Sequence, residues 1–362
     1  MSAELEKTFR KRCFNIIVIS TLVLLSAAGC VTTRKAFIDR TAKGDIKWPG
    51  PPEKPRIEYL WSLSIVGMTG ERGRRGLLDF LAGRAEGGIT DPRTSNTLLR
   101  PYSIFVDDKR NLYITDTGAY RVTIVNLDTM ETHYIISAGK RDLLFPVGIV
   151  VNREGKIFVS DSVLRKVFIY NQNRKLTGEF QGEFLRPTGL AIDNNRNIIY
   201  VADTLAHRIY VYSSDGTRLS GIGRHGAGDG EFNFPTHLWV DNNGFLYVTD
   251  SMNFRIQIFT PDGNFYKAFG TIGDAYGNLD KPKGIATDSA GHIYVIDSIK
   301  DMVKIYNFKG QLLLFFGSEG RNYGQFWLPS GIFIDSNNTI YVADTYNMRL
   351  QVFQYLGGGE DK

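Results

Sequence analysis

The most regular hydrophobic pattern along the chain is a short apolar run that ends in aspartate. The run recurs with its last residue at Asp116, Asp161, Asp203, Asp250, Asp297 and Asp344. The intervals between these aspartates are 45, 42, 47, 47 and 47 residues. Runs of this length and composition predict buried β-strands, and a fixed period of this size is typical of repeat folds. The chain is therefore predicted to contain six copies of one β unit.

Each copy contains three more candidate strands. A proline opens a β-rich run upstream of each aspartate, at Pro101, Pro146, Pro187, Pro235, Pro282 and Pro329. A third run follows a cation five positions after the aspartate, except in the fifth copy, where Met302 replaces it. A fourth run, such as FYKAF, completes the unit. Four short strands joined by Asp-Gly and Asn-Gly turns are typical of one propeller blade, so the predicted fold is all-β, a six-bladed β-propeller of four-stranded antiparallel blades.

The pattern also predicts how the ring closes. The sixth copy ends after its third run, and a spare β-rich run, RIEYLWSLSIVG, lies at residues 56–67. We expect this N-terminal strand to complete the last blade, because that pairing leaves no open sheet edge at the seam. The predicted propeller spans residues 56–357, with a non-β insert at about residues 70–97 and a C-terminal tail at residues 358–362.

The repeats resemble those of the NHL repeat family. The copies RPTGLAIDNNRNIIYVADTLAHRIYVY (residues 186–212) and LPSGIFIDSNNTIYVADTYNMRLQVF (residues 328–353) carry the resemblance, and the second copy departs from it most. The resemblance implies a six-bladed propeller. The aspartate that ends each second strand is predicted to accept backbone N–H bonds in a turn rather than to take part in catalysis.

One stretch imitates a nucleotide-binding loop. Residues 221–226, GIGRHG, fit the pattern G-x-G-x-x-G, which binds phosphates when it follows a strand and opens a helix. Here Pro235 and another β-rich run follow, and similar stretches recur at Phe269 and Phe316. We therefore predict a connection between blades and no nucleotide site.

The N-terminal residues indicate a cellular compartment. The first 30 residues contain a basic stretch, a 15-residue apolar run at residues 14–28 and then small residues before Cys30. This is the layout of a secretory signal, and the apolar run is shorter than the about 20 residues of a spanning helix. The sequence LSAAGC resembles a bacterial lipoprotein signal, which implies cleavage after residue 29 and acylation of Cys30. An ordinary cleaved signal is the alternative.

The same resemblance implies an extracytoplasmic protein anchored by acylated Cys30 to the outer membrane of a Gram-negative bacterium, where Val31 follows the cysteine. Residues 30–55 are predicted to form a lipidated tether. In the insert, residues 71–87 combine leucines with arginines, which favours a helix or loop packed across the propeller, with contact to the membrane surface as the alternative. The formal net charge of +5 does not demand a nucleic-acid partner, and none is predicted.

Histidines are the remaining candidates for chemistry. Peptidyl-hydroxyglycine amidating lyases and gluconolactonases use related propellers with a metal at the channel, which makes an extracytoplasmic metal-dependent lyase or lactonase-like hydrolase the alternative function. Two positions after each blade proline, only His237 could be a ligand, and a zinc site needs at least three protein ligands. We predict no metal, cofactor or catalytic residue. Arg224, His225 and His237 are predicted to face a ligand at the channel mouth.

The leading prediction is therefore a lipoprotein that presents a propeller surface for recognition. An envelope protein is the expected partner, with a glycan or small ligand as alternatives. The sequence shows no activated nucleophile and no matched acid and base that would specify an enzyme.

Overall fold

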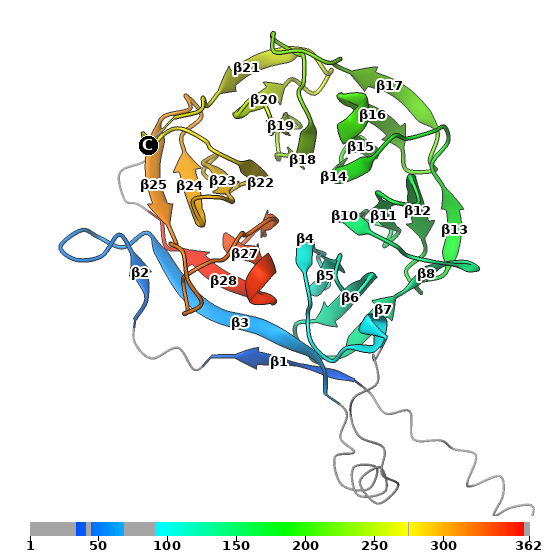
Figure 1. Ribbon diagram of the computed structural model, residues 1–362, viewed down its shortest axis with the longest axis horizontal. Helices are drawn as coiled ribbons and strands as arrows, with labels where there is room; N and C mark the ends of the chain where they lie inside the picture. Colours follow the sequence, from blue (N-terminus) through cyan, green and yellow to red (C-terminus); the bar gives the residue numbers. More distant parts are fainter. Residues whose placement is uncertain (1–33, 41–44, 69–90, 274, 358–362) are drawn as a thin grey trace, which may run out of the picture.

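Six β-sheets stand around a central channel in the computed structural model, which describes residues 34–40, 45–68, 91–273 and 275–357 (Figure 1). Each of these sheets is one blade, and in five of them the four strands follow one another outward from the channel in chain order. The prediction of an all-β, six-bladed propeller with antiparallel four-stranded blades is confirmed.

Five of the blades are built from four consecutive strands each. The first contains β4 (Pro101–Val106), β5 (Asn111–Asp116), β6 (Arg121–Asn126) and β7 (Thr132–Ile135). The second contains β10 (Pro146–Val151), β11 (Ile157–Asp161), β12 (Lys166–Tyr170) and β13 (Leu176–Glu179). The third contains β14 (Pro187–Asp193), β15 (Ile198–Asp203), β16 (Arg208–Ser213) and β17 (Arg218–Ile222). The fourth contains β18 (Pro235–Val240), β19 (Leu246–Asp250), β20 (Arg255–Phe259) and β21 (Phe265–Phe269). The fifth contains β22 (Pro282–Thr287), β23 (Ile293–Asp297), β24 (Met302–Tyr306) and β25 (Leu312–Phe316).

The sixth blade joins the two ends of the propeller. Its inner strands are β26 (Ile332–Ile334), β27 (Thr339–Asp344) and β28 (Arg349–Tyr355), and its fourth strand is β3 (Ile57–Met68). The pairing of β3 with β28 is antiparallel, with Ile57 opposite Tyr355 and Leu63 opposite Leu350. The predicted closure by the N-terminal run is confirmed.

The tether prediction for residues 30–55 needs a correction. Two strands in this stretch, β1 (Lys35–Asp39) and β2 (Lys47–Trp48), pair with β3 and widen the sixth sheet. The ring of Trp48 lies 5.7 Å from that of Phe316 and 5.8 Å from that of Phe353, so it covers the outer face of the core there. These residues belong to the propeller, since they pair with β3 and pack the partly buried ring of Trp48 against its core.

The core lies between neighbouring blades. The second strand of each blade is almost wholly buried, and its aromatic residue packs against the next sheet, as at Phe158, Tyr247 and Tyr294. The innermost strands approach one another so closely that a Cβ atom at Gly189 would lie 2.3 Å from the carbonyl oxygen of Thr236. Glycine is required there, since it alone lets two backbones come this near.

The disc has two different faces. We call "upper" the face with the turns between the second and third strands and the connections between blades, and "lower" the face with the other turns. Short elements decorate the upper side: η1 (Pro92–Thr94), η2 (Thr204–Ala206), η3 (Thr345–Asn347), and the ribbon of β8 (Ser137–Ala138) with β9 (Arg141–Asp142). The signal, Cys30, the 71–87 stretch and the tail lie outside the described residues. Within the part that is described, no helix has the length and apolar character needed to cross a bilayer.

Candidate functional site: the central channel and its two mouths

The six aspartates that end the second strands are structural. All are fully buried, and each accepts a backbone N–H from the connection before its own blade, at 2.7–3.1 Å. The donors are Leu99, Leu144, Leu185, Asn233, Asp280 and Trp327. This confirms that these carboxylates lock turns, so they leave little charge on the upper face.

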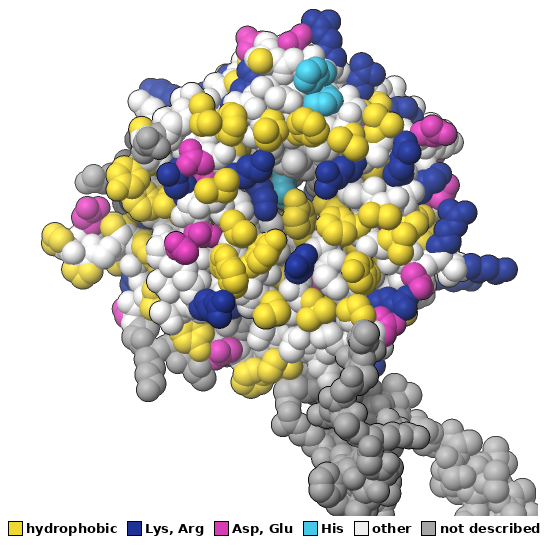
Figure 2. Space-filling view, in the orientation of Figure 1, with side chains coloured by type: hydrophobic (Ala, Val, Ile, Leu, Met, Phe, Trp, Pro, Cys, Tyr) yellow, Lys and Arg dark blue, Asp and Glu magenta, His cyan; other side chains and the backbone are white. Residues whose placement is uncertain are grey.

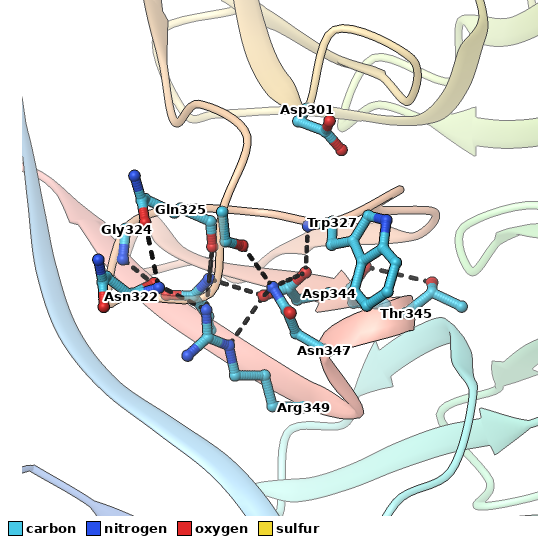
Figure 3. A network of polar contacts seen from close by, with 12 residues as sticks. Asp301, Asn322, Gly324, Gln325, Trp327, Asp344, Thr345, Asn347 and Arg349 are labelled. Atoms are coloured by element: carbon cyan, nitrogen blue, oxygen red, sulfur yellow. Dashed lines mark hydrogen bonds and ion pairs between the residues drawn. The ribbon is translucent and has the colours of Figure 1, made fainter.

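The sixth blade shows the fullest form of this lock (Figure 3). Asp344 also accepts bonds from the side chains of Asn347, Arg349 and Gln351, at 2.8–3.1 Å. Arg349 then donates to the carbonyl oxygens of Asn322 and Gln325 in the preceding connection. Asp250, Arg255 and Gln257 repeat the arrangement in the fourth blade. One buried carboxylate therefore fixes both a turn and a long connection.

The fifth blade reaches the same result with another residue. Met302 occupies the cation position, and Lys304, two residues later, places its ammonium 2.8 Å from Asp297 and donates to the carbonyl of Asn278. The side chains of Lys304 and Asp297 are 3% and 0% exposed. Lys304 therefore supplies the cation that Met302 lacks. It stands at the position, seven residues after the aspartate, that Gln257 and Gln351 occupy in their own blades.

A cavity of about 510 Å³ occupies the channel and is lined by residues from the innermost strand of every blade. Three aromatic side chains line it, and the ring of Phe333 lies 5.1 Å from that of Phe105 and 5.5 Å from that of Trp239. The Trp239 indole donates to the hydroxyl of Thr287 at 2.9 Å. The volume is within the range of small-ligand pockets, which combine apolar walls with a few polar groups.

Acidic and amide side chains surround the lower mouth of this cavity. They are Asp107, Asp108, Asp193, Asn194, Asn195, Asp241, Asn242, Asp335, Ser336 and Asn337, with Arg110 and Arg153 among them. Asp107, Asp241 and Asp335 each cap their own turn and accept a tyrosine hydroxyl, from Tyr113, Tyr247 and Tyr341 respectively. Asp193 holds the same position, but its Oδ2 is buried with no hydrogen-bond partner among the described residues. The lower mouth is therefore electronegative and already fixed in place.

His237 lies deeper, toward the upper mouth. Its ring stacks on Tyr102 with centroids 5.5 Å apart, and Nδ1 is 3.3 Å from the hydroxyl of Thr236. Its Nε2 is buried without a partner among the described residues. Burial, reinforced by the charge of Lys283, lowers the pKa of His237 to about 3, so the imidazole is neutral. Burial also lowers the pKa of Lys283 to about 8 and raises that of Tyr102.

The structure separates the three residues predicted to face a ligand. His237 lines the cavity, whereas Arg224 and His225 belong to the connection between β17 and β18. Arg224 pairs with Glu231, and the ring of His225 lies 4.3 Å from that of His207. Burial lowers the pKa of His207, and the proximity of His225 adds to the effect. The GIGRHG stretch runs from the last two residues of β17 into the connection to β18, and no helix follows it, as predicted from its flanks.

Sequence reasoning missed the lower mouth. The sequence feature that could have indicated it is the aspartate or asparagine that begins the turn between the first and second strands of each blade. It occurs in DDKRN, NREG, DNNRN, DNNG, DSAG and DSNN. Across the described part of the chain, no three or more His, Cys, Asp or Glu side chains gather closely enough to hold a metal ion.

Comparisons with known proteins agree with this architecture. Residues 326–353 match the family model described as NHL repeat, and residues 194–256 match one described as 6-bladed beta-propeller. The chain carries NHL repeat sequence on a six-bladed propeller. The predicted resemblance to the NHL repeat family is confirmed in these two respects.

Two curated relatives match only one part of this NHL-type propeller. Protein brain tumor of Drosophila melanogaster is 31% identical over 128 residues, which are 34% of this chain and 12% of that protein. The peptidylglycine alpha-amidating monooxygenase of Rattus norvegicus is 25% identical over 132 residues, 32% of this chain and 14% of that protein. The matched parts are thus a small fraction of both relatives.

Solved structures match over a much larger part of the propeller. A streptogramin B lyase has a TM-score of 0.54 at 12% identity, with 70% of this chain and 93% of that one covered. An auxiliary nutrient binding protein of Bacteroides thetaiotaomicron has a TM-score of 0.58 at 12% identity, with 73% and 71% covered. At these identities the likeness shows the fold, which hosts both a lyase and a binding protein.

Proposed function

We propose that this chain is an extracytoplasmic binding protein, anchored by an acylated Cys30, that receives a ligand at the lower mouth of its channel. The observation that carries the proposal is the cavity itself, with an aromatic wall and a rim of fixed carboxylates and amides. The general role is consistent with the auxiliary nutrient binding proteins that share the fold. The outer membrane of a Gram-negative bacterium remains the expected location.

The chemistry of the mouth favours a neutral or cationic polar ligand. Phe105, Trp239 and Phe333 can pack against the C–H face of a sugar ring or an apolar side chain, while carboxylates and amides accept and donate hydrogen bonds at its edge. An anionic ligand would meet the five aspartates of the rim, and like charges repel. A glycan, or a protruding loop of an envelope protein, fits these requirements.

Thermal denaturation with a panel of neutral, cationic and anionic saccharides tests the cavity. A ligand at one hundred times its Kd stabilises the folded state by about 2.7 kcal/mol, which raises the Tm by several degrees. We expect shifts from neutral or cationic members, and none from them in Trp239→Ala. Trp61→Phe on the outer strand β3 is the control that keeps the shift. A response to anionic saccharides alone would contradict the proposed chemistry.

Metabolic labelling with a palmitate analogue tests the anchor separately. We expect label in the wild-type chain and none in Cys30→Ser. An unlabelled wild-type chain would remove the anchor while leaving the cavity proposal intact.

A lyase is the competing function, and one observation favours it. The buried Nε2 of His237 has no hydrogen-bond partner in the described chain and lies beside Tyr102 and Lys283, which is unusual for a purely structural histidine. Metal analysis of the purified full chain and of His237→Ala distinguishes the two functions. One tightly held metal per chain that is lost in His237→Ala would support the lyase.

A further inference from the structure

Exposed apolar side chains form a ring on the upper face. At the second position after the locked aspartates stand Val163, Leu205, Met252, Ile299 and Tyr346, which are 57%, 45%, 40%, 58% and 42% exposed. The first blade has glycine at this position, and Tyr120 of the same turn is 40% exposed. Because the six turns are equivalent in the six blades, these side chains stand at one level around the channel. We call them the upper ring.

Cations are interleaved with this ring (Figure 2). The guanidinium of Arg100 lies 5.5 Å from the ring centroid of Tyr346, and that of Arg321 lies 4.8 Å from the ring centroid of Trp327. The ammonium of Lys281 is 3.4 Å from the sulfur of Met252. The neighbouring aspartates are buried in their locks, so the charge that this part of the face presents to solvent is mainly positive.

The N-terminal chain enters the propeller at the outer edge of the first blade. Lys35, at the start of β1, pairs with Met68 of β3 and with Glu131 in the turn between β6 and β7. Arg34 and Arg121 both lie over the ring of Tyr134, at 5.3 and 4.2 Å from its centroid. Arg121 is the first residue after the upper turn of the first blade. The described chain therefore begins at the outer edge of the first blade, between its lower turn at residues 126–131 and its upper turn.

This entry point restricts the distance between the proposed anchor at Cys30 and the propeller. Cys30 precedes Arg34 by four residues, and an extended chain covers at most about 3.5 Å per residue. An acyl group on Cys30 would hold this outer edge of the first blade within about 14 Å of the bilayer surface. A tether of about 25 residues would have allowed the propeller any distance and orientation relative to the membrane. Because β1 begins at Lys35, only a few residues separate Cys30 from the folded propeller.

We propose that the upper ring docks on the surface of a bilayer that contains anionic lipid. The inference rests on the proposed anchor at Cys30. Apolar side chains at turn tips enter the boundary between headgroups and acyl chains, and the cations between them attract anionic headgroups. Several exposed apolar side chains gathered on one face mark an interaction site, and a bilayer with anionic lipid fits the charge of this face, with the proposed anchor at the edge of the disc holding the disc near the surface. The lower mouth then faces away from the membrane and stays open to ligand.

Environment-sensitive fluorescence tests this orientation in the full chain. Ile299→Cys on the upper ring and Ser336→Cys at the lower mouth, both in a Cys13→Ser background, are labelled with a nitrobenzoxadiazole probe. The proteins are reconstituted in vesicles of phosphatidylcholine and phosphatidylglycerol at 3:1. We expect a blue shift and a several-fold increase in emission at Ile299→Cys, and neither at Ser336→Cys. The parent without an introduced cysteine gives the background.

The outcomes separate the two proposals. An equal response at the two positions, or none at the upper ring, overturns membrane docking even where Cys30 is acylated. A response at Ile299→Cys that appears only when an envelope protein fraction is added overturns it in favour of a protein partner. A response on vesicles from a chain without acyl label supports docking and rejects the anchor. A weaker response in vesicles of phosphatidylcholine alone supports the role of the cations.

Discussion

The upper and lower faces use aspartate in opposite ways. On the upper face the carboxylates are fully buried and bind backbone N–H groups and, in three blades, a cationic side chain. On the lower face the corresponding residues, such as Asp107 and Asp335, cap exposed turns and remain part of the cavity rim. One residue type therefore builds a rigid support on one side and an electronegative mouth on the other.

The difference shows how a repeated fold can specialise its two sides. Buried locks fix the upper turns from beneath, so the residues at their tips do not contribute to folding and can be apolar or basic. Lower turns are stabilised by the same aspartates that line the channel cavity, so under the proposed function their sequence serves both stability and binding. Specialisation follows from burial, since the charge of a buried carboxylate is neutralised within the protein.

The largest expected effect comes from removing one buried aspartate of the upper face and comparing the loss of stability with that for an aspartate of a lower turn. Asp344→Ala removes the buried carboxylate that accepts from the side chains of Asn347, Arg349 and Gln351, and breaking a buried pair in this way costs about 3–5 kcal/mol of unfolding free energy. Asp335→Ala removes hydrogen bonds at an exposed turn and is expected to cost about 1 kcal/mol. Urea denaturation of both variants measures the difference. Equal losses would refute the contrast between the faces.

The fifth blade allows a test by rescue. Lys304→Ala leaves the Asp297 carboxylate buried with backbone donors alone, and we expect a loss of about 3 kcal/mol. The double substitution Met302→Arg with Lys304→Gln recreates the pattern of the fourth and sixth blades. It should recover most of the lost free energy of unfolding. Denaturation in urea again provides the measurement. A double variant no more stable than Lys304→Ala would show that the lock depends on the local connection.

The channel supplies a test that depends on pH. His237 has a pKa of about 3 when folded and an ordinary value of about 6.5 when unfolded, so above pH 6.5 it is neutral in both states. Below pH 6.5 the unfolded chain binds a proton that the folded chain excludes, and stability falls until about pH 3. At pH 5 the loss is about 2 kcal/mol. His237→Phe, compared by urea denaturation at pH 7.5 and 5, should lose about 2 kcal/mol less than the wild type, and an identical loss would contradict the burial of this imidazole.

The sequence predicted the fold almost completely because the propeller repeats its information. Six copies of the aspartate run identified the blades, and the missing fourth strand of the last copy identified β3 as the closing strand. β1 and β2 were not predicted, because they occur once and their stretch is rich in proline, lysine and glycine. Trp48, which anchors β2 on Phe316 and Phe353, was the residue that could have indicated it.

The site was predicted only in part, for a geometric reason. His237 was found because it breaks a column of glycines on the inner strands, and the structure places it in the cavity. Arg224 and His225 are close to it in sequence but lie on a connection of the upper face. The rim aspartates come from four blades separated by more than 40 residues, and only the closed ring brings them together.

The smallest expected effect concerns the upper ring and separates folding from recognition. Ile299→Ser and Leu205→Ser should each change the free energy of unfolding by less than about 0.5 kcal/mol, since both side chains are already largely in water. Ile296→Ala in the adjacent strand, where the side chain is fully buried, should cost about 2–5 kcal/mol and serves as the matched control. A ring that can be made polar without a loss of stability is not maintained by folding, and its apolar character then requires a surface outside the protein. Losses at Ile299 comparable with that at Ile296 would show instead that the ring is part of the core.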